Sequence, residues 1–184
     1  IFYFVPMQLA LQLQKSGEYV AALDWYQTVY AYQLPAEQRK IYYGLAIENS
    51  NLSSNHAQDP HWLRDALNPH NIAARRSNPY TRFTLMSIAR CFVEFADAEF
   101  TRDTAESIAQ ARALYVTARQ LLHQSELQTV LDASGDPVLP NPVLEALCAR
   151  VEIQLAKLRQ GRNIAGMQRN LDLTILASDG LPAG

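Results

Sequence analysis

Apolar residues recur every three or four positions in several stretches of the chain, which is the spacing of an amphipathic α-helix. The first stretch follows Pro6 and ends at Gly17, and the second begins at Glu18 and continues to about Gln33. The Ser-Gly pair between them favours a tight turn, so the two predicted helices would pack antiparallel. We therefore expect an αα-hairpin over residues 1–33.

Proline marks the helix boundaries in the middle of the chain. Pro35 ends the second helix, and residues 36–49 predict a third. Two further prolines each follow an Asp or Asn, a combination that suits the N-cap and the first helical position. They predict a short helix over 60–67 and a long one from Pro79 to about Thr101.

The long helix carries large apolar residues that we expect near one face: Phe83, Met86, Phe92, Phe95 and Phe100. Beyond it the pattern turns polar before a second helical repeat begins. Asp103 followed by Glu106 approximates a capping box, in which each side chain bonds a backbone amide of the other residue. Such a cap stabilises a helix by about 1 kcal/mol, which explains these polar residues by a structural role without a substrate site. We therefore predict a helix start there and a long helix pair over 79–123.

The last predicted helix covers residues 141–161, because Asn141-Pro142 repeats the signal for a helix start and Gly161 ends the pattern. Its apolar residues form a narrow stripe: Leu144, Leu147, Val151, Leu155 and Leu158. Alternating and β-branched residues then predict an extended tail or linker over 162–184. The pattern as a whole predicts an all-α fold, with six or seven helices in an irregular bundle over 1–161 and a short extended C-terminal tail.

The composition suits a single core and no polyanionic partner. The chain has 184 residues, of which 48% are hydrophobic and 18% charged. Sixteen basic and eighteen acidic residues give a net charge of −2, which provides no electrostatic footprint for nucleic acid. No apolar run reaches the roughly 20 residues that a membrane-spanning helix needs. Cys91 and Cys148 lie among apolar neighbours, so we interpret both as reduced core residues.

Two clusters of polar residues are candidates for chemistry. His56, Asp59 and His61 lie close together, but without the His-Glu-x-x-His spacing of a zinc site or a cysteine partner, so we expect loop residues and no metal. A second cluster surrounds a predicted helix end: Glu94, Asp97, Glu99 and Asp103. A catalytic carboxylate pair needs environments that split the two pKa values. We expect a solvated polar face instead.

The remaining motifs do not favour an enzyme. No serine lies in a Gly-x-Ser-x-Gly context, and the seven glycines form no phosphate-binding loop. The stretch from Asp132 to Asp136 lacks the alternating acidic ligands of a calcium loop and reads as a turn. We therefore predict a protein without catalytic residues and without a cofactor.

Aromatic and basic residues are the candidates for contact with a partner. Core packing is the first expectation for the dense aromatic residues, and an exposed partner surface is the alternative. On the second reading the contacts would be Trp25, Tyr26, Arg75 and Arg76. The small-residue and aromatic spacing from Gly17 to Tyr26 also resembles one tetratricopeptide hairpin, although no copy follows about 34 residues later. A tetratricopeptide-like adaptor that binds a peptide in an aromatic groove is therefore the alternative function.

Three stretches together resemble the A subunit of the Tc insecticidal toxin complexes. The first is AEFTRDTAESIAQARALY, residues 98–115, where an acidic and aromatic helix end leads through a polar turn into an Ala-rich helix. The second is NPVLEALCARVEIQLAKLRQGRNIAGMQRNLDL, residues 141–173, with its Asn-Pro start, its Asn-Ile-x-x-Gly turn and the extended segment after it. The third, residues 2–30, is similar to a hairpin with a Phe-x-x-Pro start and an Ala-x-x-Trp second helix.

The resemblance implies a structural role within a very large secreted bacterial toxin. Such A subunits form a bell-shaped homopentamer, in which an α-helical shell surrounds a translocation channel that delivers a toxic cargo into host cells. The matched stretches belong to the C-terminal part of the shell, before the linker and the pore-forming region, whereas the B–C subunits and the host receptor bind elsewhere. The chain starts without Met and without the basic region of a signal peptide. We accordingly expect it to be an interior fragment of a longer protein.

Overall fold

The computed structural model of the protein describes residues 3–35, 79–127 and 141–169, and these ranges are all-α, as predicted. They hold five helices and no β-strand: α1 (Phe4–Lys15), α2 (Tyr19–Val29), α4 (Pro79–Arg102), α5 (Ala105–Leu122) and α6 (Pro142–Arg159). The helices predicted over 36–49 and 60–67 lie outside the described residues. None of the five is both long and apolar enough to cross a membrane.

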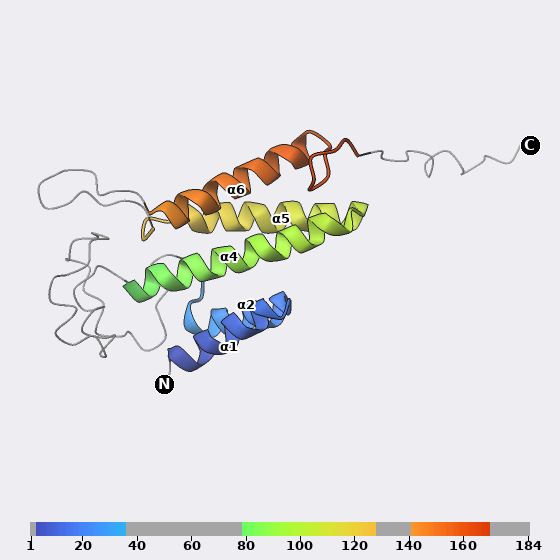
Figure 1. Ribbon diagram of the computed structural model, residues 1–184. Helices are drawn as coiled ribbons and strands as arrows, with labels where there is room; N and C mark the ends of the chain where they lie inside the picture. Colours follow the sequence, from blue (N-terminus) through green and yellow to red (C-terminus); the bar gives the residue numbers. More distant parts are fainter. Residues whose placement is uncertain (1–2, 36–78, 128–140, 170–184) are drawn as a thin grey trace, which may run out of the picture.

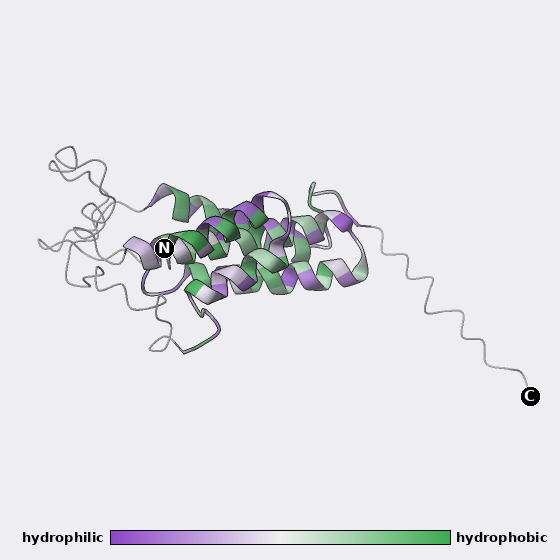
Figure 2. Ribbon diagram, turned by 90° about the horizontal axis from the view of Figure 1, so that it is seen from below, coloured by the Kyte–Doolittle hydropathy of each residue, from purple (hydrophilic) through white to green (hydrophobic). Residues whose placement is uncertain are grey.

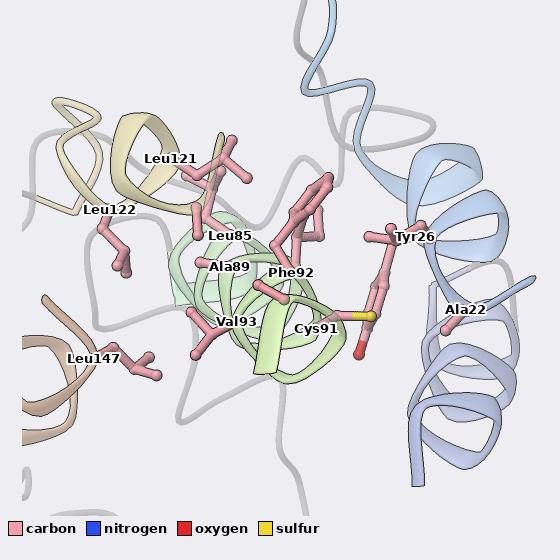
Figure 3. Packing of buried hydrophobic residues seen from close by; sticks show 14 of the residues in the cluster. Ala22, Tyr26, Leu85, Ala89, Cys91, Phe92, Val93, Leu121, Leu122 and Leu147 are labelled. Carbon is pink, nitrogen blue, oxygen red and sulfur yellow. The ribbon is translucent and has the colours of Figure 1, made fainter. Parts of the chain in front are cut away.

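The central element is α4, with the α1–α2 hairpin on one side and α5 and α6 on the other (Figure 1). The core accordingly lies along two sides of α4. Figure 3 shows Tyr26 of α2 facing Cys91 of α4, while Leu121 and Leu147 approach the same helix from α5 and α6. Each helix carries hydrophilic and hydrophobic positions along its length, and the apolar ones line the contacts between helices (Figure 2).

The prediction of one apolar face for the large residues of α4 is wrong, because a central helix is buried on two sides. Phe92 and Phe100 are buried, but Phe83 is 52% exposed. Small and polar residues also belong to the buried surface of α4, among them Thr84 and Ala96. The hydroxyl of Thr84 donates to the carbonyl oxygen of its own helix four residues back, at 2.7 Å, so its burial leaves no donor unsatisfied.

Glycine ends two of the helices, as the sequence predicted. Gly17 has φ = 83°, and the amide after it bonds back to the Leu13 carbonyl at 3.0 Å, which closes α1. Gly161 (φ = 64°) closes α6 in the same way, with the Arg162 amide 2.9 Å from the Lys157 carbonyl. By contrast α2 ends at Val29 and not near Gln33. The next residue is extended, which places its tyrosine ring in the core.

The start of α5 lies one residue later than predicted. The N-cap is Thr104, whose hydroxyl accepts from the Ser107 amide at 3.1 Å, while the Ser107 hydroxyl accepts from the Thr104 amide at 3.0 Å. Asp103 and Glu106 therefore do not form the capping box. Asp103 has φ = 53°, a left-handed conformation that Asp tolerates better than most residues and that reverses the chain between α4 and α5.

The last helix begins as predicted, with the Asn141 side chain accepting from the Val143 amide at 3.0 Å and proline in the first turn. The middle of the predicted apolar stripe is buried, whereas Leu144 and Leu158 are only partly covered. Residues 162–169 fold back in a closed turn in place of the extended tail that we predicted from 162 onward. One bridge, Arg162 to Gln168, closes that turn, because Gly166 (φ = 89°) allows the reversal. The division of the chain at residue 161 into a domain and a tail stays a prediction.

Candidate functional site

The four carboxylates singled out in the sequence lie along the C-terminal half of α4 and just beyond it. Each is bound to a different donor, so they do not act as a pair. Only Asp103 is solvated to the extent that we predicted for all four. The prediction of a solvated face is wrong for Asp97 and Glu99, because their side chains are only 14% and 8% exposed.

Glu94 connects α4 to both helices of the hairpin through one buried amide. The Gln14 side chain donates to Glu94 Oε2 at 2.7 Å and accepts from the Tyr26 hydroxyl at 2.8 Å. Because Gln14 is buried, both ends of its amide need partners, and this arrangement supplies them. Burial raises the pKa of Tyr26, with the charge of Glu94 as a smaller cause, so the phenol remains a donor.

Asp97 connects α4 to α5 and α6. One carboxylate oxygen accepts from the Tyr115 hydroxyl and the other from the Arg150 guanidinium. Tyr115 is fully buried, and burial, followed by its bond to Asp97, raises its pKa. We call Asp97, Tyr115 and Arg150 the Asp97 junction. It joins three helices at one side chain.

The last two carboxylates hold the end of α4 and the turn after α6. Glu99 lies 2.9 Å from the Arg102 guanidinium, one helical turn away on the same helix. Asp103 accepts from Arg169, which brings the closed turn against the junction of α4 and α5. Each arrangement satisfies a carboxylate with a cation, which suits a structural role and gives neither acid the separate environment that general acid–base chemistry uses.

In the described part of the chain no group of three or more His, Cys, Asp or Glu could hold a metal ion. His56, Asp59 and His61 lie outside that part. Cys91 is buried and its Sγ lies 3.9 Å from a backbone carbonyl oxygen, and burial raises the pKa of its thiol to about 12. Cys148 is partly buried, and burial raises its pKa as well. Both are free thiols, and neither is activated as a nucleophile.

The predicted partner contacts separate in the structure. Tyr26 is a core residue with no exposed surface, so its prediction as a partner contact is wrong: its ring packs under α4 and its hydroxyl is bound. The neighbouring Trp25 points outward and is 41% exposed. Arg75 and Arg76 lie outside the described residues. An aromatic groove formed by Trp25 and Tyr26 together is therefore not present.

Two surface hollows were not predicted. The first, of about 460 Å³, lies between α5 and α6 and has an aliphatic floor with arginines at its rim. Its lining residues are Ala105, Ile108, Ala109, Arg112, Val116, Arg119, Leu155, Leu158 and Arg159. The second, of about 640 Å³, lies where the chain leaves α2, beside α4 and α5. Its lining is neutral and rich in amides: Tyr32, Gln33, Phe92, Thr117, Gln120, Leu121 and Gln124.

The sequence contains a signal for the α5 side of the first hollow. Arg112 and Arg119 are seven residues apart, which is two helical turns, and so they lie on one face of α5. Ile108 and Val116, which are eight residues apart, share that face. The pairing with α6 requires the tertiary structure.

A comparison of the sequence with models of known protein families finds no match. A comparison with curated proteins finds no similar protein either.

Proposed function

We propose that the chain is a non-catalytic structural segment of a large Tc-toxin-like A subunit, where it forms part of the helical shell around a translocation channel. The observation that carries the structural role is the use of the carboxylates on α4. Glu94 ties α4 to the α1–α2 hairpin through Gln14, and Asp97 ties it to α5 and α6. The assembly itself is proposed from the resemblance of three stretches of sequence.

In this role the segment acts as a rigid wall. Polar ties at fixed points along α4 favour one arrangement of the helices over alternatives that apolar packing alone would tolerate. The full-length chain would assemble as a homo-oligomer, a pentamer by resemblance, in which the described helices pack against neighbouring copies. Toxin B–C subunits and a host receptor would bind regions outside this segment.

Cross-linking of the native assembly tests the proposal. Copies labelled with ¹⁵N are mixed with unlabelled copies before assembly and joined through Lys15 and Lys157, which lie on α1 and α6. Mixed-isotope cross-links between described helices of different copies are the expected result. Links within one copy only, in a protein that remains a monomer, would contradict the shell.

The alternative is the tetratricopeptide-like adaptor, and the exposed Trp25 on α2 is the observation that favours it. Its groove would have to form without Tyr26, which is buried. An adaptor predicts a monomer that captures peptides and loses them on Trp25→Ala. A shell segment predicts that the same substitution leaves peptide capture at background and alters assembly.

A further inference from the structure

We propose that the groove between α5 and α6 docks an amphipathic helix of a partner protein, whose apolar stripe is flanked by carboxylates. The groove is the 460 Å³ hollow described above, and we call it the arginine groove. Its existence does not depend on the toxin-like assembly. Three features argue for this occupant: the shape of the floor, the charge of the rim and the absence of aromatic side chains.

The floor of the arginine groove fits an apolar stripe at helical spacing. Ile108 and Val116 of α5 and Leu155 and Leu158 of α6 line it, and all but the buried Leu155 are only partly covered within the chain. Ala109, which also lines the groove, has a small side chain and lets another backbone approach closely. A third helix lying along two packed helices would bury this floor under its own apolar face. Amphipathic peptides commonly bind hydrophobic grooves in this way.

The rim of the groove carries more positive charge than its own acids neutralise. Arg112 and Arg159 are exposed, and no carboxylate of the described residues lies within ion-pairing distance of either. Arg119 lies 3.7 Å from Glu152, and both of these side chains are substantially exposed, so that pair is weak. Glu106 also lies in the first turn of α5, but it does not line the groove.

Arginine suits a carboxylate partner for two reasons. Its guanidinium can bind a carboxylate through two parallel hydrogen bonds, and its aliphatic stem extends the apolar floor toward the rim. A partner helix with acidic residues on both flanks would meet Arg112 and Arg119 on one side and Arg159 on the other. Its apolar stripe would lie between them.

A nucleic acid fits the groove less well. Proteins that hold single strands combine basic residues with aromatic side chains on which bases stack. Among the described residues no aromatic side chain lines the arginine groove, and its aliphatic floor offers no hydrogen-bond donors to a sugar–phosphate backbone. The chain as a whole is slightly acidic, with a net charge of −2.

The test is binding of a synthetic probe to the purified chain. The probe is a fluorescein-labelled helical peptide with a leucine stripe flanked by glutamates, and its matched control carries glutamine in place of every glutamate. The protein variants are Arg112→Gln with Arg159→Gln, and the control is Arg90→Gln, an exposed arginine of α4 outside the groove. Fluorescence anisotropy measures affinity at low and high salt.

The glutamate peptide should bind at least about tenfold more tightly than the glutamine peptide, because charged pairs at the rim set the preference. The double variant should lose about the same factor, Arg90→Gln should not, and added salt should weaken binding. In methyl NMR spectra the Ile108 and Leu155 signals should shift on binding. The expected result therefore shows both that charge determines the peptide preference and that the peptide lies in the arginine groove.

Several results would overturn the proposal. Absence of binding would show that the groove does not dock such a helix. Equal binding by the double variant would show that Arg112 and Arg159 do not recognise it. Tighter binding of a DNA oligonucleotide would assign the groove to another class of partner. Self-association of the wild type that the double variant abolishes would make a second copy the occupant. Peptide binding that appears only after removal of residues 170–184 would make the tail the occupant.

Discussion

The strongest consequence of this structure concerns the Asp97 junction, and substitution of Asp97 tests it. Asp97→Ala removes the acceptor of the Tyr115 hydroxyl and the counterion of Arg150 in one step. Tyr115 has no exposed surface, so no solvent molecule replaces the lost acceptor without rearrangement of the core. The three helices that meet at this side chain would then be joined mainly by apolar packing, together with the weak Arg119–Glu152 pair between α5 and α6.

The magnitude follows from the burial of each partner. A buried hydroxyl left without an acceptor costs roughly 1–3 kcal/mol. The Arg150 side chain is 52% exposed, so loss of that ion pair adds only about 0.2–1 kcal/mol. The better helix propensity of alanine returns about 0.5 kcal/mol. We expect Asp97→Ala to lower the free energy of unfolding by about 2 kcal/mol, and Asp97→Asn, which keeps an oxygen acceptor, by about 1 kcal/mol.

Urea unfolding followed by circular dichroism measures these differences. The control is Asp24→Ala, which removes an exposed carboxylate of α2 and should change stability by less than about 0.5 kcal/mol. A double-mutant cycle of Asp97→Ala with Tyr115→Phe should give a coupling energy of about 1–2 kcal/mol. If Asp97→Ala behaves like the Asp24 control, or the cycle shows no coupling, the junction does not hold the helices and the reasoning fails.

Four further predictions test other parts of the account. Gln14→Leu should lower the free energy of unfolding in urea by about 2 kcal/mol, because it leaves Glu94 and the Tyr26 hydroxyl without their shared partner. A loss below about 0.5 kcal/mol would show that Gln14 does not connect these two side chains. Gly17→Ala should cost about 1 kcal/mol in the same assay because φ is 83°, although no described residue other than the two chain neighbours lies within 4 Å of the added methyl. An unchanged midpoint would contradict that conformation. Gln154→Met should raise the melting temperature, because its buried Oε1 has no hydrogen-bond partner among the described residues, and a lower melting temperature would mean that the oxygen is bound. Burial raises the pKa of the Cys91 thiol from 9.0 to about 12, so the folded state binds the thiol proton more tightly than the unfolded state. The protonated thiol therefore contributes stability that is complete below pH 9 and is lost as the pH rises toward about 12. In unfolding measured between pH 9 and about 12, the wild type should therefore lose more stability than Cys91→Ala. An equal loss in both proteins would refute the raised pKa of Cys91.

Local signals in the sequence predicted four of the helix ends correctly and missed the end of α2. Pro79 and Asn141-Pro142 open α4 and α6 where they should, and Gly17 and Gly161 close α1 and α6. These signals work because a missing amide or a left-handed residue acts within one turn of the backbone. No tertiary contact is needed to read them.

What the sequence did not predict depends on tertiary neighbours. An aspartate on the polar side of an isolated helix looks solvated, yet Asp97 is covered because α5 and α6 both pack beside it. Trp25 and Tyr26 look alike as partner contacts, and only the position of α4 decides that Tyr26 is the buried one. The cap of α5 moved by one residue because Asp103 is used to reverse the chain. The arginine groove has a visible half on α5, but its other rim comes from α6.

The most direct test of the central claim is the size of the native polypeptide and of its assembly. An antibody against the described helices would capture the protein from its source under native conditions, and mass spectrometry would give both masses. The account predicts a polypeptide far larger than the 20.7 kDa of this sequence, held in an oligomer of several copies. A monomer of about 20.7 kDa would contradict the shell and leave the adaptor as the better explanation.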